Sequence, residues 1–117
     1  MGFESLIKEM TQLIVQGDGE GAASCFAKDG YYDDVFYGLF NQPNIPDLIE
    51  NYFHRDAENF VWEIVDTVSS KDIGYARYVF SYDSKLEVCV GKRAIFEGVS
   101  ICHLKQGKIL SRTMHVV

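Results

Sequence analysis

The sequence predicts a single α+β domain, residues 1–117, in which three N-terminal helices pack against a curved antiparallel β-sheet. In the N-terminal half, apolar residues recur at helical spacing. The C-terminal half contains four runs of β-branched and aromatic residues, separated by short polar turns. Helices gathered at one end of a chain and strands at the other are typical of an α+β layer structure. When the sheet is strongly curved, a cone-shaped space opens under the helices, and a ligand would lie there.

Three helical segments are expected. The first presents one apolar stripe and ends at Gly17. Asp18 is expected to cap a second, short helix that contains Phe26 and closes near Asp29-Gly30. Pro46 suits the first turn of a third helix. The apolar positions of the first and third helices are Phe3, Leu6, Ile7, Met10, Leu13 and Ile14, and Leu48, Ile49, Tyr52 and Phe53.

The expected strands are marked by aromatic and β-branched residues. Tyr31–Gly38 is predicted to be a short strand, followed by a loop at residues 41–44. Residues 86–91 fit either a strand extension or a wide loop. Four later strands with short connections predict an antiparallel meander. These strands are Phe60–Ser69, Ile73–Tyr82, Arg93–Leu104 and Lys108–Val117.

Composition limits the classes of partner. The formal charge is −6 and the pI is about 4.9, and no cluster of Lys and Arg exists, so a nucleic-acid partner is not expected. No apolar run approaches the length of a membrane span, and the N-terminus lacks the features of a signal peptide, so we expect no membrane partner and a cytoplasmic location. The three cysteines, Cys25, Cys89 and Cys102, are odd in number and form no C-x-x-C pair, which favours reduced thiols.

Three motifs carry a resemblance to a known family. They are the Gly17-Asp18 break, the Phe-Ala-x-Asp-Gly sequence of residues 26–30, and the Gly107-Lys108-Ile109 turn before the last strand. With this order of elements, the chain resembles the nuclear-transport-factor-2-like superfamily, in its SnoaL-like and ketosteroid-isomerase-like branch. The resemblance covers nearly the whole chain and implies a cone-shaped, cystatin-like α+β roll. It specifies the fold better than the chemistry, since one fold hosts many functions.

The resemblance places Asp34 where ketosteroid isomerases keep their proton-shuttling aspartate. The two oxyanion donors of that family are replaced, because Met10 stands where the tyrosine would be and Cys102 where the protonated aspartic acid would be. Ketosteroid isomerisation itself is therefore not expected. The limonene-epoxide-hydrolase branch uses an Arg-x-Asp pair, and here Arg77 is followed by Val79 in place of the aspartate.

The predicted catalytic residues are Asp34, His115 and Arg77. A carboxylate in an aromatic pocket loses hydration and becomes a base near neutral pH, although Asp33 and Asp34 also fit a plain polar strand end. His115 is expected to share a face with Thr113 and to reach the pocket mouth.

Arg77 is expected either to pair with Glu97 across neighbouring strands or to anchor a polar ligand. His103 is expected on the face opposite Cys102. No metal site is predicted, because His54, His103 and His115 have no common ligand spacing.

Inward-facing strand positions supply the predicted ligand-binding residues. They are Tyr32, Trp62, Tyr78 and Phe96, and the resemblance implies that Cys102 also faces the cavity and belongs to this set. Core packing accounts for most such aromatic residues, yet a buried tyrosine hydroxyl needs a polar partner, which suits a flat and partly polar ligand.

Two functions are in balance. The first is a cofactor-independent enzyme of the isomerase, cyclase or lyase type that acts by proton transfer on an apolar or aromatic carbonyl compound, with Asp34 as the base. The second is a noncatalytic ligand-binding or dimerisation module. A homodimer is expected in either case, because Val99 and Ile101 would otherwise leave an apolar patch on the outer face of the sheet.

Overall fold

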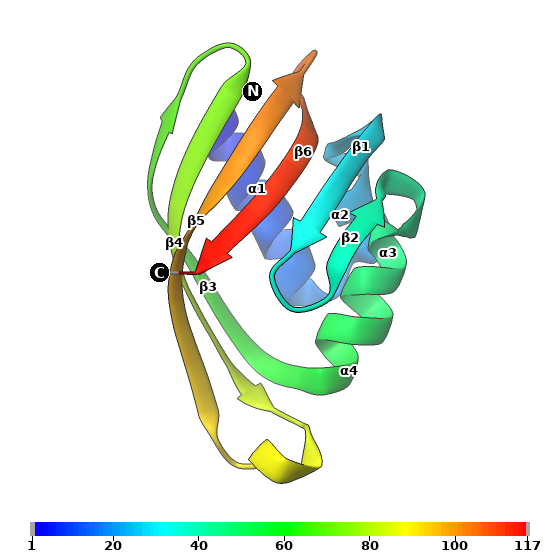
Figure 1. Ribbon diagram of the computed structural model, residues 1–117, viewed down its shortest axis with the longest axis vertical. Helices are drawn as coiled ribbons and strands as arrows, with labels where there is room; N and C mark the ends of the chain where they lie inside the picture. The colour runs from blue at the N-terminus through cyan, green and yellow to red at the C-terminus, as the bar shows by residue number, and fades with distance from the viewer. Residues whose placement is uncertain (1, 117) are drawn as a thin grey trace.

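The computed structural model describes residues 2–116, with the side chain of Cys89 excepted. A short helical layer covers one face of a six-stranded sheet (Figure 1). The helical segments are α1 (Phe3–Gln16), α2 (Gly19–Ser24), η1 (Gln42–Asn44), α3 (Ile45–Leu48), η2 (Ile49–Phe53), α4 (His54–Asp56) and η3 (Glu87–Cys89). The strands are β1 (Phe26–Asp34), β2 (Gly38–Asn41), β3 (Ala57–Ser69), β4 (Ile73–Ser84), β5 (Arg93–Lys105) and β6 (Lys108–Val116).

The strand order is β2-β1-β6-β5-β4-β3, so the predicted antiparallel meander is confirmed for β3 to β6. The sheet as a whole is mixed, because β1 pairs in parallel with β6. That parallel pair was not expected. It forms since the chain returns to its first strand only after the helices and the whole meander, a long connection that parallel neighbours require. The end of the last strand at Val117 lies outside the described residues.

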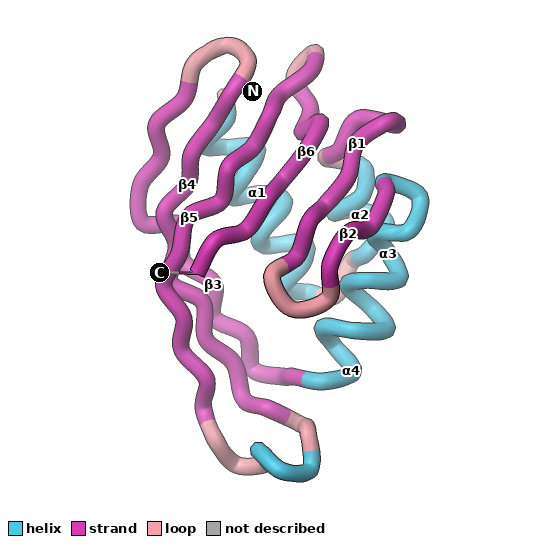
Figure 2. Tube along the Cα trace, in the orientation of Figure 1, coloured by secondary structure: helices cyan, strands magenta, loops and turns pink. Residues whose placement is uncertain are grey.

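Helix α1 lies across the inner face of the sheet, as Figures 1 and 2 show. Its buried residues include Ile7, Met10 and Ile14, which confirms the predicted apolar stripe. Gly17 ends the helix in the left-handed conformation with φ of 79°, a conformation that glycine adopts without steric cost. The helix therefore contributes its apolar stripe to the core beneath the sheet.

The boundary after the second helix differs from the prediction. Helix α2 stops at Ser24, and Phe26 begins strand β1 instead of continuing the helix. The Cys25 carbonyl accepts a hydrogen bond from the Ile109 amide at 3.0 Å, and Phe26 pairs with Ile109 in β6. This long-range pairing outweighs the local helical pattern.

The predicted strand Tyr31–Gly38 is also divided in two. Strand β1 ends at Asp34, the chain turns through residues 35–37, and Gly38 starts β2, which runs back along β1 as far as Asn41. The segment that the sequence left open, residues 86–91, forms the turn between β4 and β5 and contains the short helix η3. The third helix is found as the continuous run α3, η2 and α4.

Candidate functional site

An open cavity of about 210 Å³ lies between the helical run α3 to α4 and the part of the sheet that strands β3 and β4 form. Most of its wall is aromatic. The turn after β1 gives two residues, the helices give two, and β3 and β4 with the turn that follows give the rest. The lining residues are Phe36, Tyr37, Phe53, Asp56, Ala57, Phe60, Phe80, Tyr82, Ser84 and Leu86. A space of this size and character suits an apolar molecule with one aromatic ring.

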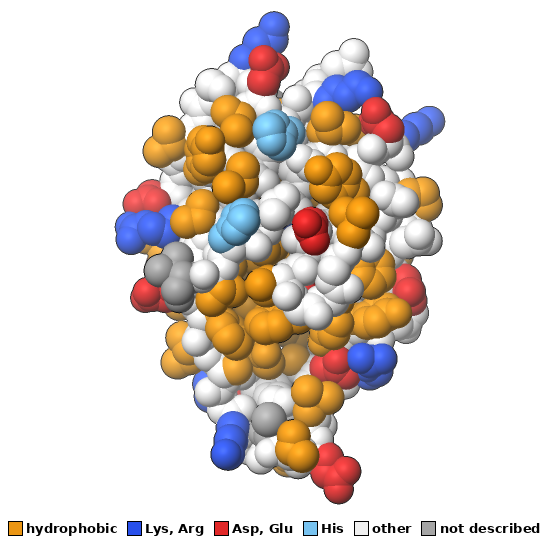
Figure 3. Space-filling model, in the orientation of Figure 1, with side chains coloured by type: hydrophobic (Ala, Val, Ile, Leu, Met, Phe, Trp, Pro, Cys, Tyr) orange, Lys and Arg blue, Asp and Glu red, His pale blue; other side chains and the backbone are white. Residues whose placement is uncertain are grey.

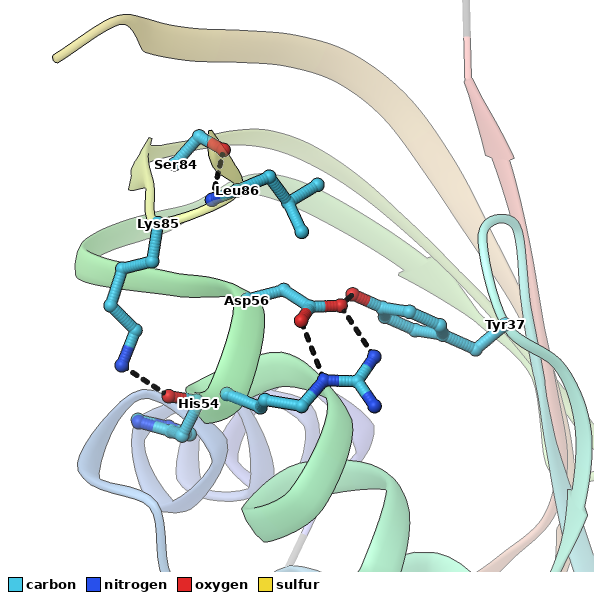
Figure 4. Close-up of polar contacts among 7 residues, drawn as sticks. Tyr37, His54, Asp56, Ser84, Lys85 and Leu86 are labelled. Atoms are coloured by element: carbon cyan, nitrogen blue, oxygen red, sulfur yellow. Dashed lines mark hydrogen bonds and ion pairs between the residues drawn. The ribbon is translucent and has the colours of Figure 1, made fainter. Parts of the chain in front are cut away.

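One side of the cavity is polar (Figure 4). The Tyr37 hydroxyl donates to Asp56 Oδ2 at 2.7 Å, and Arg55 donates to both oxygens of the same carboxylate at 2.6 and 2.8 Å. The hydrogen bond from Arg55 lowers the pKa of Asp56. Burial and the bond to Asp56 raise the pKa of Tyr37. Asp56 is thus a fixed carboxylate that already has its donors, and it is poorly suited to take a substrate proton.

Hydrogen bonds connect the turn after β4 to helix α4, which carries Asp56. The Lys85 amide donates to the Asp56 carbonyl at 2.8 Å, and Lys85 Nζ donates to the His54 carbonyl at 2.7 Å. The Leu86 amide donates to Ser84 Oγ at 3.2 Å, and the Leu86 side chain lies on the cavity side of the turn in Figure 4. These bonds fix one edge of the cavity entrance.

A second, narrow space of about 10 Å³ continues toward the centre of the sheet and shares Phe36 and Phe80 with the first. That volume is close to what one water molecule needs. Its lining brings together the predicted aspartate and three of the predicted ligand-binding side chains. The lining residues are Asp34, Val35, Phe36, Trp62, Tyr78, Phe80, Phe96, Met114 and Val116.

Asp34 is the carboxylate of this inner space. It is 5% exposed, and its Oδ2 accepts hydrogen bonds from the amides of Phe36 at 2.9 Å and Tyr37 at 3.0 Å. Burial raises the pKa of Asp34, and the two amide bonds and the charge of Arg112 partly offset that rise. A desolvated carboxylate with one oxygen held by the backbone is arranged as a general base.

Arg112 in β6 is a site residue that sequence reasoning missed. Its side chain is fully buried. Its Nε and Nη2 donate to Ser100 Oγ at 3.2 and 3.0 Å, and its guanidinium carbon lies 5.2 Å from the Tyr32 ring centre and 4.9 Å from that of Trp62. Arg112 shares one face of β6 with the apolar residues Met114 and Val116, because residues two apart in a strand point the same way. This apolar face was the signal in the sequence for the inward direction of Arg112.

The five predicted ligand-binding residues all lie on the inner side of the sheet. Tyr32, Tyr78 and Cys102 are buried, while Trp62 and Phe96 are half-buried beside the cavities. The Trp62 ring stacks on the ring of Phe80, with 4.3 Å between the two ring centres. Burial raises the pKa of the Cys102 thiol to about 11, so this cysteine is a neutral wall residue at neutral pH. Their inward direction is as predicted, and their binding role stays a prediction.

Arg77 and His115 are not brought to the site. Arg77 is exposed on the outer face and donates to the two oxygens of Asp66 at 3.2 and 2.8 Å. The expected pair with Glu97 is wrong, because Arg77 lies directly opposite Asp66 in β3 whereas Glu97 lies opposite Val79. His115 is also exposed, since alternation along β6 turns Arg112 and Met114 inward and His115 outward.

Two kinds of site are not found among the described residues. No group of three or more His, Cys, Asp or Glu side chains is placed to hold a metal ion there. Within residues 2–116, none of the helices has the length and apolar character needed to cross a membrane. Cys25 and Cys102 are free thiols, and the side chain of Cys89 lies outside the described part of the chain.

Solved structures share the fold of this chain. No known family and no curated protein sequence matches this chain. A ketosteroid-isomerase-like protein from Catenulispora acidiphila, solved with trimethylamine, superposes with a TM-score of 0.83 at 14% identity, over 94% of this chain and 83% of that one. The predicted nuclear-transport-factor-2-like and ketosteroid-isomerase-like fold is therefore confirmed.

Neighbours with this fold carry several chemistries. An epoxide hydrolase of the limonene-epoxide-hydrolase-like type from M. tuberculosis has a TM-score of 0.78 at 10% identity, over 97% of this chain and 80% of that one. A protein from Shewanella putrefaciens assigned to the SnoaL-like polyketide cyclases has a TM-score of 0.78 at 13% identity, over 99% of this chain and 80% of that one. Identities this low establish the fold alone, and the activity has to be argued from the site.

Proposed function

We propose that this protein binds a small apolar or aromatic carbonyl compound in the cavity under its helices and moves a proton on it, with Asp34 as the base and without a cofactor. The observation that carries the proposal is the position of Asp34. It is a buried carboxylate with a raised pKa, and it lies where the aromatic cavity narrows.

The arrangement of Asp34 suits proton abstraction next to a carbonyl group. Both amide hydrogen bonds go to Oδ2, which leaves Oδ1 for the proton of a substrate carbon. The aromatic walls at Phe60 and Phe80 would hold the apolar body of the substrate and exclude water from the carboxylate.

Ligand binding without chemistry is the second candidate. It is favoured by the small volume of the inner space, about 10 Å³, against about 210 Å³ in the outer cavity. A ligand confined to the outer cavity would contact Phe53, Phe60 and Tyr82 without reaching Asp34. The neighbour solved with trimethylamine supports small-molecule binding by this fold in general.

Phenylacetone separates the two candidates, because its activated CH₂ protons exchange with deuterium when a base removes them. Binding is followed by the fluorescence of Trp62, the single tryptophan of the chain, and exchange in D₂O by NMR. We expect bound phenylacetone to exchange faster than it does in buffer, and Asp34→Asn to remove about 99% of that acceleration.

Asp33→Asn is the matched control, since Asp33 is the neighbouring carboxylate on the opposite side of β1. It should keep most of the accelerated exchange, because Asp33 acts on Asp34 only through its charge. Binding without accelerated exchange would overturn the catalytic proposal in favour of the binding module, and no binding would overturn both.

We also propose that the protein is a homodimer formed through the outer face of the sheet. Apolar side chains gather over the strands in the view of Figure 3, and most charged ones lie around the rim. Outward-facing apolar residues with large exposed surface support this proposal; they are Val61, Val65, Val68, Tyr75 and Ile95. Size-exclusion chromatography with light scattering at micromolar concentration should give twice the chain mass of 13.3 kDa, and a monomer would refute the dimer.

A further inference from the structure

Arg112 is a buried charge with no acidic hydrogen-bond partner among the described residues. Its donors Nε and Nη2 both go to the neutral Ser100 hydroxyl. Asp34 acts on it electrostatically, but the hydrogen bonds of Asp34 go to the amides of Phe36 and Tyr37. Because a buried cation is costly unless it is paired and hydrogen-bonded, this arrangement indicates a missing negative partner.

Unpartnered polar atoms gather around the same guanidinium. In the described part of the chain, four buried side-chain polar atoms have no hydrogen-bond partner, and three of them are Tyr32 Oη, Trp62 Nε1 and Arg112 Nη1. The Tyr32 and Trp62 rings are the two that contact the guanidinium. All three groups can donate a hydrogen bond, and the indole and guanidinium groups can only donate. A group of donors with a net positive charge is suited to an anionic acceptor.

We propose that the ligand of this protein is a small apolar or aromatic acid, whose carboxylate accepts hydrogen bonds from Arg112, Tyr32 and Trp62. This inference rests on the proposed function in one respect, namely that the cavity under the helices binds a small molecule. A carboxylate group on the ligand brings a negative charge within hydrogen-bond reach of the guanidinium, whereas a ligand without such a group would leave Arg112 with only the through-space charge of Asp34. The two oxygens of the ligand carboxylate offer enough lone pairs for all three donors.

The inner space leads toward these donors. Trp62 and Met114 both line that space. The Met114 thioether accepts a hydrogen bond from Ser100 Oγ at 3.2 Å, and the same hydroxyl binds Arg112. A thioether is a weak acceptor on a flexible side chain, so it is readily displaced by a ligand oxygen. The ring of the acid would then occupy the aromatic cavity, and its carboxylate would replace Met114 beside Ser100 and Arg112.

Phenylacetate and phenylacetone provide the test, because they share a ring and a CH₂ group and differ in charge. Both are titrated into the full chain, with Trp62 fluorescence as the readout. A charge-assisted hydrogen bond contributes enough for about tenfold in affinity, so phenylacetate should bind at least that much more tightly. The single indole N–H signal in the NMR spectrum should move downfield with phenylacetate, which measures the contact to Trp62 without any substitution.

Arg112→Met should reduce the preference for phenylacetate to less than about twofold, because it removes the charge and keeps much of the side-chain volume. Arg77→Met is the matched control on the outer face and should keep the full preference. Circular dichroism establishes that both variants are folded, and the wild-type titrations and the indole signal decide the matter even if Arg112→Met does not fold.

The outcomes separate the two proposals. Equal affinity for both ligands with an unmoved indole signal would overturn the acid preference and leave the proposed cavity function standing. If neither ligand bound, the proposed function would fail first and the acid preference with it.

Discussion

Arg77 and Arg112 lie on opposite faces of one sheet, and the surroundings of the arginine side chain differ between the two faces. On the outer face, Arg77 and Asp66 form an ion pair at 2.8 Å in which both side chains are 61% exposed. On the inner face, Arg112 is fully buried and binds a serine hydroxyl and two aromatic rings. An exposed pair contributes little to stability because water already solvates both charges, whereas a buried charge without a counterion destabilises the fold.

The difference shows on which face the fold contains polar groups that lower its stability. The inner face has small residues opposite its large ones, and it holds charged and polar atoms that the fold leaves partly unsatisfied. The outer face satisfies its charges with each other and with water. Polar groups that are costly for folding are expected at sites of function, and this expectation supports the proposal that the function lies on the inner face.

The largest effect expected from this comparison is at Gly98, on the inner side of β5. A Cβ at this position would collide with the Tyr78 hydroxyl and with the backbone carbonyl of His115, which belongs to the neighbouring strand. We expect Gly98→Ala to lower the free energy of unfolding by about 3 kcal/mol, because relief would require the β5–β6 pairing to shift. Urea denaturation monitored by circular dichroism measures this value.

Ile95→Thr is the control in the same strand. Ile95 points outward and is 67% exposed in the single chain, and threonine keeps the β-branched shape, so at protein concentrations low enough for the monomer the expected change in the free energy of unfolding is within about 0.5 kcal/mol. Equal losses in the two variants would show that strand β5 does not distinguish its two faces in the way described.

A smaller effect of opposite sign is expected at the buried arginine. Arg112→Met should raise the free energy of unfolding by about 1 kcal/mol in the absence of ligand, because it replaces a buried charge that has no hydrogen-bonded acidic partner by an apolar side chain of similar length. Arg77→Met should change the free energy of unfolding little, since only an exposed ion pair is lost. The same urea experiment serves both variants.

A strong destabilisation by Arg112→Met would contradict the comparison. It would mean that the contacts of Arg112 with Ser100, Tyr32 and Trp62 outweigh the cost of its burial. Arg112 would then be a structural residue of the core, and the argument for an anionic ligand would lose its physical basis.

How far the sequence predicts this molecule depends on whether the signal is local. The apolar stripe of α1 and the four strands of the meander follow from short-range periodicity and are confirmed. The start of β1 at Phe26 and its parallel pairing with β6 depend on Ile109, which is far away in the sequence, and local patterns indicated a helix there. Long-range pairing is what the sequence alone could not supply.

The candidate site divides in the same way. Strand position placed Tyr32, Trp62 and Tyr78 on the inner face, the family resemblance placed Cys102 there, and the structure has all four on that face. In β6, the inner and outer faces were predicted the wrong way round, so His115 was expected near the pocket in place of Arg112. Because a shift of one position inverts every side chain of a strand, a single error of this kind was enough to hide the buried cation.

The finest expected difference between the two faces is in pH dependence. Burial raises the pKa of Asp34 above its ordinary value of 3.8, while the hydrogen bond from Arg77 lowers the pKa of Asp66 below it. The unfolded chain therefore releases the proton of Asp34 at a lower pH than the folded protein does. Above pH 3.8, up to the folded-state pKa, the contribution of Asp34 to stability falls as pH rises. Asp66 does the reverse, since its contribution is present above pH 3.8 and is lost as pH falls through its lowered pKa.

Urea denaturation at pH 3 and pH 7 tests this opposition with Asp34→Asn and Asp66→Asn. Compared with the wild type, Asp34→Asn should be relatively more stable at pH 7 than at pH 3, because it no longer deprotonates inside the fold. Asp66→Asn should be relatively less stable at pH 7, by a small amount that salt reduces, because its partner Arg77 is exposed. If both variants shifted in the same direction, Asp34 would behave as a solvated carboxylate in spite of its burial, and it would lose its claim to be the base of this site.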